Sequence, residues 1–147
     1  SYNYGARKIK RVLDTVKNTV KIAFVTTLTY FIIISLMPGF FARLFTTDKQ
    51  LIDLVTKVLP IFMGGIWLFG VQMTAQTFFV GTGQAGKSLF IALLRKVIVL
   101  IPLAIILPKF LGVMGVFYSE PIADLTSAST SGVFLYLSVK KLREGKY

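Results

Sequence analysis

Long stretches without charge alternate with basic clusters along this chain, and this pattern limits the fold more than any other feature. Residues 22–42 and 58–86 contain no Asp, Glu, Lys or Arg. Residues 97–108 and 125–139 are also uncharged, and a further apolar stretch precedes each of them. A helix that crosses a bilayer needs about 20 mostly apolar residues. The pattern therefore predicts an all-α, polytopic membrane helix bundle with transmembrane helices at about residues 22–42, 58–80, 90–108 and 116–139.

The composition supports a membrane protein and excludes several functions. Hydrophobic residues make up 54% of the chain and charged residues only 16%, whereas soluble domains carry about 25% charged residues. The sequence has no His and no Cys, which excludes disulfides, zinc or haem held by these residues, and catalysis by either of them. Acids are few and no pairing of a nucleophile with a base is visible. We therefore predict that the chain is not an enzyme and binds no metal or cofactor.

The basic residues are distributed unevenly between the predicted ends of the four helices. Thirteen of the 17 Lys and Arg residues lie before residue 22, between residues 81 and 96, or after residue 139, which four spans place on one side. The other side holds Arg43, Lys49, Lys57 and Lys109. Because basic residues concentrate in cytoplasmic loops, we predict a plasma (inner) membrane protein with both termini in the cytoplasm. The net charge of +11 then faces membrane lipid headgroups, and nucleic acid is not expected as a partner.

The first 21 residues differ from the spans. Apolar residues follow helical spacing at positions 9, 12, 13, 16 and 20, and most of the basic residues lie off this face. This pattern predicts an amphipathic helix over residues 1–21 that lies on the cytoplasmic surface, and residues 140–147 form a basic cytoplasmic tail. A signal peptide has a shorter basic region and a small-residue cleavage site. Because no Met begins the chain, we expect a fragment of a longer protein.

A phosphate-loop pattern occurs between the second and third predicted spans. The string GTGQAGKS at residues 81–88 contains the Gly81, Gly86, Lys87 and Ser88 of the G-x-x-x-x-G-K-[ST] motif, which cradles nucleotide phosphates when it follows a strand. Here the preceding uncharged run is long enough to be a membrane helix, whereas a core strand has about 4–8 residues. No apolar run ends in an Asp placed to hold Mg²⁺. We interpret the match as false and the segment as a Gly-rich turn.

Polar residues inside the second span form one candidate substrate path. Gly65, Gln72 and Gln76 share a helix face with Phe69 between them. Such residues hydrogen-bond or pack closely between helices, or they line a path for a polar substrate. The spacing leaves both interpretations open.

The fourth span carries a second polar stripe. Glu120, Asp124, Ser127 and Ser131 step by four, three and four residues along one helix face. If the helix began at Pro121, the acids would lie in its first turn, where the helix dipole favours them. If it begins near Val116, Asp124 lies inside the membrane, in a cavity, and is a candidate for a functional role.

In the first span, Tyr30 follows Thr26 at i+4. These hydroxyls are candidates for the path or ordinary packing groups.

Several strings, in order, resemble one family. The chain opens with SYNYGA, has LFTTD at residues 44–48, continues from GTGQAGKS into LFIALLR at residues 89–95, and has GVFYSEPIAD at residues 115–124. Together they resemble the C-terminal third of a multidrug and toxic compound extrusion (MATE) transporter, across nearly the whole chain.

The resemblance implies a parent with twelve spans in two six-helix lobes, of which this chain forms spans nine to twelve. Such a parent is a secondary antiporter in which inward Na⁺ or H⁺ drives export of organic, often cationic, drugs, and the missing N-terminal lobe is a partner of this chain. Some members carry an ion-binding acid in span ten. Residues 59–80 have no acid, so the coupling ion site is expected in the other lobe.

Two other functions compete with drug export. A lipid-linked saccharide flippase of the same superfamily shares the architecture, although residues 81–88 and 120–124 favour the drug antiporter. A membrane-bound nucleotide-binding protein is a remote alternative that rests on the phosphate-loop match alone.

Overall fold

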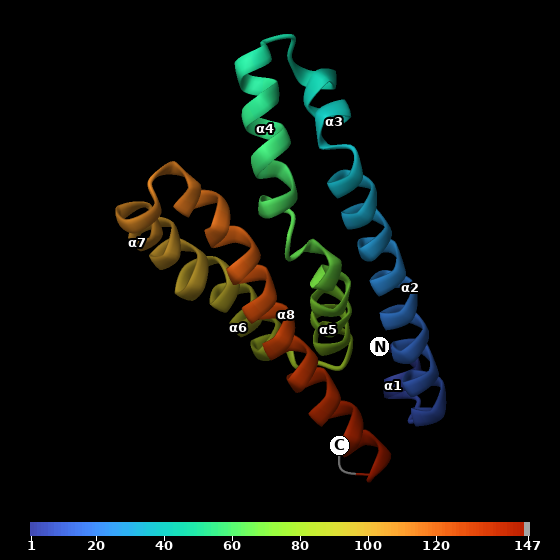
Figure 1. Cartoon of the computed structure of the whole chain (residues 1–147). Coiled ribbons are helices and arrows are strands. Elements are labelled where there is room, and N and C mark those ends of the chain that lie inside the picture. Colours follow the sequence, from blue (N-terminus) through green and yellow to red (C-terminus); the bar gives the residue numbers. More distant parts are fainter. Residues whose placement is uncertain (146–147) are drawn as a thin grey trace.

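A computed structural model describes residues 1–145, and its regular elements are all helical. The chain forms ten helical segments in this described part (Figure 1). They are α1 (Tyr2–Gly5), α2 (Ile9–Leu36), α3 (Pro38–Phe45), α4 (Lys49–Phe62), η1 (Ile66–Leu68), α5 (Phe69–Gly81), α6 (Ala85–Leu93), η2 (Leu94–Leu100), α7 (Ile101–Leu111) and α8 (Val113–Arg143). The predicted all-α membrane helix bundle is confirmed, although several boundaries differ.

The first difference concerns the N-terminal amphipathic helix. From Ile9 onward it is continuous with the first span in α2, because no Gly or Pro interrupts residues 9–36 and a started helix propagates readily. Its apolar face packs on protein: Val12 belongs to the buried core with Phe79 and Leu135. The helix therefore has no break at the expected boundary of residue 22, and α2 ends at Leu36 instead of residue 42. Pro38, which suits the first turn of a new helix, begins α3.

The second span is bent. It begins at Lys49 instead of residue 58, where Asp48 caps α4 by accepting a hydrogen bond from Gln50 N at 2.9 Å. The helix breaks after Phe62 at Gly64 and Gly65, and the two arms differ in direction by 42°. The second arm, α5, lies directly against α2, because a Cβ at Gly70 would overlap the Ala23 backbone.

The third and fourth spans form a hairpin. The stretch α6–η2–α7 is one apolar helix of 27 residues, and its middle segment η2 has π-helical hydrogen bonding, which is rare and occurs often at functional sites. The chain turns at Gly112, whose φ is +60°, and α8 returns along α7 (Figure 1). Gly115 permits this contact, because a Cβ there would overlap the backbone of Leu107.

Length and composition support membrane crossing for most of these helices. Ile9–Leu36 and Ala85–Leu111 each meet both criteria, and the bent pair Lys49–Phe62 with Ile66–Gly81 gives a third candidate. The predicted fourth span, α8, is long enough but less hydrophobic, because acids and hydroxyl residues occupy one of its faces. Those polar residues are largely buried within the bundle.

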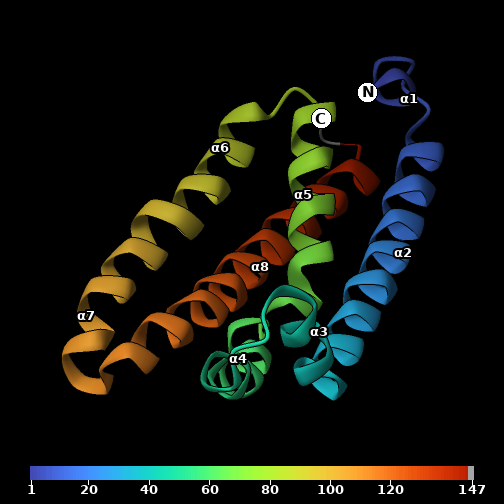
Figure 2. The same ribbon diagram turned by 90° about the horizontal axis from the view of Figure 1, so that it is seen from above.

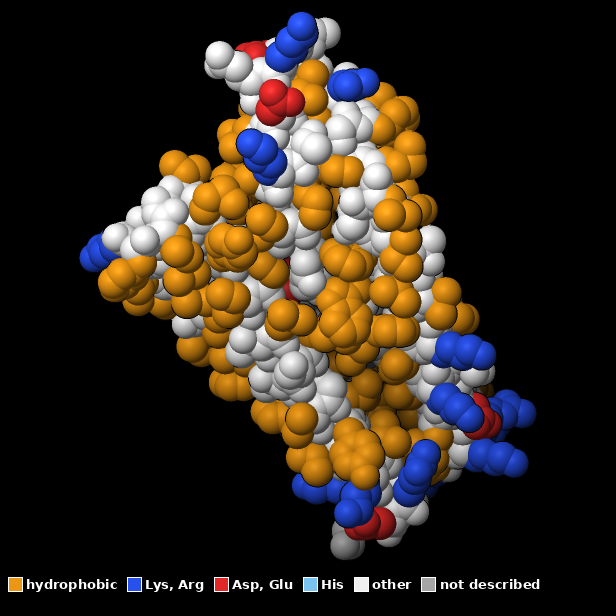
Figure 3. Space-filling view, viewed as in Figure 1, with side chains coloured by type: hydrophobic (Ala, Val, Ile, Leu, Met, Phe, Trp, Pro, Cys, Tyr) orange, Lys and Arg blue, Asp and Glu red, His pale blue; other side chains and the backbone are white. Residues whose placement is uncertain are grey.

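Both ends of the described chain lie at the same end of the helix bundle. In two perpendicular views α5 lies between α2 and α8, and α1 lies at the same end of the bundle as the end of α8 (Figures 1 and 2). On the face shown in Figure 3, hydrophobic side chains cover most of the middle of the molecule, whereas Lys and Arg gather towards its ends. This distribution on that face is the one expected of helices that cross a bilayer.

Candidate functional site

Arg95 joins the two acids of α8 in one ion cluster. Its Nε donates a hydrogen bond to Asp124 Oδ1 at 2.6 Å, and its Nη2 donates to Glu120 Oε1 at 2.7 Å. The acids are four residues apart on a helix, so both face the same neighbour. Arg95 comes from the π-helical segment η2, and its guanidinium lies 5.4 Å from the ring centre of Phe69 on α5.

The cluster is mostly shielded from solvent. The Arg95 and Asp124 side chains are 15% and 7% exposed. Separating one buried partner from such a group leaves an uncompensated charge, which costs about 3–5 kcal/mol. The three charges therefore hold η2 against α8 in a fixed arrangement.

A cavity of about 200 Å³ opens onto this cluster. Its other walls come from the bend between α4 and α5, and they are Phe62, Met63, Ile66 and Phe69. Gly65, in the same bend, lies directly against Asp124. The cavity thus combines aromatic and thioether surface with buried carboxylates. It can hold a group that is both apolar and positively charged.

The serine stripe of α8 continues the cluster along the helix. Ser127 and Ser131 are fully buried, and Ser131 Oγ donates to the Ser127 carbonyl at 2.6 Å. Ser127 Oγ and Gln72 Oε1 are buried and have no hydrogen-bond partner. Gln72 is on α5 and Ser127 is on α8, and these two helices pack together. The stripe expected from the sequence therefore faces the bundle interior.

The other two residues predicted to line the substrate path, Gln76 and Tyr30, are less buried. Gln76 is half-buried on α5 and Tyr30 is exposed on α2, so the described chain leaves the Tyr30 ring uncovered. Tyr30 and Gln76 are not among the residues that line the cavity at the ion cluster.

The position of Arg95 along its helix differs from the position that the sequence predicts. The charge count placed it with the basic residues at the cytoplasmic end, yet it is well inside the Ala85–Leu111 helix. The same holds for its neighbour Lys96, so the correction lowers the bias from thirteen to eleven basic residues against four, and its direction stays the same. The available signal was the pair Arg95-Lys96 between two apolar runs, together with two acids four residues apart.

The phosphate-loop match lies at a helix-to-helix turn. Residues 81–88 run from the last residue of α5, through a short turn, into the start of α6, so a helix stands where such a loop requires a strand. Gly83 takes the positive φ, +77°. Lys87 Nζ donates to Gln84 Oε1 at 2.6 Å and to Ser138 Oγ at 3.5 Å. The segment is thus a turn between two helices, and the absence of nucleotide binding stays a prediction.

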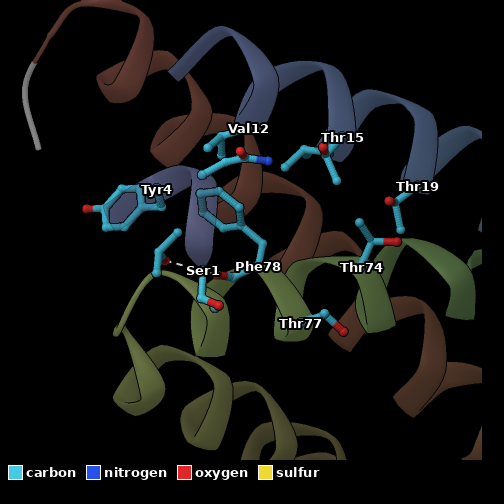
Figure 4. Close-up of a pocket in the computed structure, with 12 residues that line it drawn as sticks. Ser1, Tyr4, Val12, Thr15, Thr19, Thr74, Thr77 and Phe78 are labelled. Atoms are coloured by element: carbon cyan, nitrogen blue, oxygen red, sulfur yellow. Dashed lines mark hydrogen bonds between the residues drawn. The ribbon is translucent and has the colours of Figure 1, made fainter. Parts of the chain in front are cut away.

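A second cavity, of about 160 Å³, lies between α1, α2 and α5 (Figure 4). It is lined by Thr15 and Thr19 on α2 and by Thr74 and Thr77 on α5, and Tyr4 and Phe78 lie at its other end. Thr15, Thr74 and Thr77 each donate to the carbonyl four residues earlier in their own helix. Their oxygens remain acceptors for a small polar group. The sequence reasoning assigned none of these residues to a site.

Comparison with known proteins gives consistent matches. The MatE family model matches residues 1–106. Multidrug export protein MepA of Staphylococcus aureus (strain NCTC 8325 / PS 47) is 29% identical over 140 residues, which cover 93% of this chain and 30% of MepA. MepA of Staphylococcus haemolyticus (strain JCSC1435) is 27% identical, and the match covers 92% of this chain and 30% of that protein.

Solved structures show the same fold. The MATE multidrug transporter DinF-BH superposes with a TM-score of 0.86 at 34% identity, covering 92% of this chain and 30% of that one. An outward-facing multidrug resistance MATE family transporter of the MOP superfamily has a TM-score of 0.87 at 23% identity, covering 97% and 32%. The chain spans about 30% of the length of the curated relatives it matches.

Proposed function

This chain belongs to the MatE family, and on that premise we propose that it acts as part of a drug/cation antiporter that exports organic, often cationic, compounds. The chain is a multi-pass membrane protein by its relatives and its apolar helices. In the proposal, the N-terminal lobe of the same protein completes the transport path, and inward Na⁺ or H⁺ supplies the driving force.

The ion cluster at the α4–α5 bend carries this proposal. One guanidinium and two carboxylates leave one formal negative charge, which lies beside an open cavity walled by Phe62, Met63 and Phe69. Aromatic rings attract cations over their faces, and more strongly when water is excluded. The combination suits a flat or branched organic cation. A neutral polar molecule would lose hydration there without gaining an opposite charge.

We also propose that the more basic end of the bundle faces the cytoplasm. This end carries the start of α2, the turn at residues 82–84 and the end of α8, and its basic residues outnumber those of the opposite end. Cytoplasmic loops of membrane proteins carry this excess. Substrate would then move away from the basic end during export.

The test is Asp124→Asn in the full-length protein, with export of a cationic and a neutral dye measured at matched expression. The change removes the net negative charge while Glu120 still pairs with Arg95. We expect export of the cationic dye to fall several-fold more than export of the neutral dye, because the lost carboxylate attracts a cation in the cavity. The upper bound of this attraction is ~4 kcal/mol, for contact at about 4 Å and an effective dielectric constant of about 20. Dependence on the imposed Na⁺ or pH gradient should persist.

Asp53→Asn is the matched control, because Asp53 is an exposed acid on α4 and loses the same charge. Equal export of every dye in Asp124→Asn and the parent would show that the cluster only holds helices together. Loss of gradient dependence would place the coupling site in this lobe.

A further inference from the structure

The lysine of the rejected phosphate loop belongs to a separate groove at the basic end of the bundle. This groove has a volume of about 240 Å³ and lies between the start of α6 and the last turns of α8. It is lined by Lys87, Phe134, Leu137, Ser138 and Lys141. None of the five is used in the ion cluster or in the drug cavity.

Every described contact of the Lys87 ammonium group is with a neutral group. Its ammonium group contacts Gln84 Oε1 and Ser138 Oγ and lies 5.4 Å from the ring centre of Phe79. Ser138 is buried, so the hydroxyl marks the inner end of the groove. An ammonium group that is positioned in advance but not neutralised is a ready partner for an anion.

The groove walls are amphipathic. Phe134 stacks on Phe90 with ring centres 6.0 Å apart and planes inclined by 27°. Leu137 and Phe90 are exposed to the outside of the bundle, on the side where α6 begins an apolar helix long enough to cross a membrane. The described lining thus carries two positive charges at one end, apolar surface beside them, and no acid.

The depth of the groove matches a headgroup position. Lys87 is in the first turn of the helical stretch Ala85–Leu111, which spans about 40 Å at 1.5 Å per residue. The hydrocarbon core is about 30 Å thick, so the ends of this helix reach the phosphates. Long basic side chains near helix ends reach this region readily.

We propose that this groove binds an anionic phospholipid, with its phosphate between Lys87 and Lys141 and its acyl chains along Phe90, Phe134 and Leu137. A free phosphate compound would use the two lysines but gain nothing from the apolar wall. The lipid uses both parts. The site lies at the end that the proposed topology places in the cytoplasm, where anionic lipids are abundant.

The experiment measures the first lipid bound by the full-length protein in detergent, by native mass spectrometry with phosphatidylglycerol and with phosphatidylcholine. The test variant is Lys87→Gln/Lys141→Gln. The control, Lys49→Gln/Lys57→Gln, loses the same charge at the opposite end of the bundle. At about fivefold per basic residue, we expect phosphatidylglycerol affinity to fall by ten- to thirtyfold in the test variant and to change little in the control. Phosphatidylcholine affinity should be the same in all three proteins.

Two further measurements distinguish loss of the lipid site from misfolding and from phosphate binding. Lys87→Arg/Lys141→Arg should restore phosphatidylglycerol binding, which a misfolded variant would not do. Inorganic phosphate at millimolar concentration should leave the bound lipid in place. Displacement by phosphate, or equal losses in the test and control variants, would overturn the lipid site. Neither outcome bears on drug export, which depends on the separate ion cluster.

Discussion

Gly65 in the bend of the second span lies directly against Asp124 of α8, with no room for a Cβ between them. The contact joins the two elements that define the candidate site: the break between α4 and α5, and the carboxylate that Arg95 binds. Glycine is required here for a close approach and not for an unusual backbone angle, because Gly65 has ordinary helical φ and ψ values. The bend and the ion cluster therefore depend on each other.

Gly65→Ala should destabilise the protein and impair export together. The new methyl overlaps Asp124, and overpacking of this kind costs about 1–3 kcal/mol. Gly132→Ala is the control, since its Cβ would be 3.7 Å from Val71 Cγ1, an ordinary contact. Replacing a helical glycine there should stabilise by about 0.5–1 kcal/mol. Thermal unfolding of both full-length variants in detergent checks the prediction, and a Tm at Gly65→Ala equal to that of the parent would contradict the contact.

Arg95→Gln should lower the stability of the protein more than removal of all three charges of the cluster. The single substitution leaves Glu120 and Asp124 beside each other without a cation. This lowers the free energy of unfolding by about 3–5 kcal/mol. The triple variant Arg95→Gln/Glu120→Gln/Asp124→Asn removes every charge and should recover much of the lost Tm. Arg95→Lys should be intermediate, because an ammonium group lacks the planar fork that contacts two carboxylates. Additive Tm changes across the single variants would argue against a coupled cluster.

The turn at residues 81–88 should bind no nucleotide. It follows a helix, and the N–H groups of residues 82, 83 and 84 donate to carbonyls of α5. In a phosphate loop, the backbone N–H groups face the phosphates instead. Titration of fluorescent ATP with Mg²⁺ against the purified protein should show no saturable, competable signal. Micromolar binding that Lys87→Ala abolishes would restore the nucleotide-binding alternative.

Single cysteines report the orientation, because the chain has no native thiol. Thr47→Cys lies between α3 and α4, and Gly86→Cys lies at the start of α6; both positions are exposed, and no group within 4 Å crowds a side chain at 86. On intact cells, a membrane-impermeant maleimide should label position 47 and leave position 86 unlabelled until the membrane is opened. The reverse pattern would invert the proposed topology.

Local sequence determined which stretches are helical and which faces are polar. The uncharged residues 22–36 and 97–108 lie within helices, because hydrocarbon requires every backbone group to bond internally. The spacing of Glu120, Asp124, Ser127 and Ser131 determined a shared face, since helical residues three and four apart are neighbours. The break before Pro38 and the turn at Gly112 also follow from local backbone chemistry.

Only the tertiary structure decided what those faces meet. Arg95 is 25 and 29 residues from its two acids, and no local pattern specifies a pairing between separate helices. The same holds for Gly65 against Asp124, and for the apolar face of residues 9–20, which packs on α5 and α8 where the sequence alone predicted a lipid surface. Helical periodicity determines the direction in which a side chain points, whereas its partner depends on how several helices pack at once.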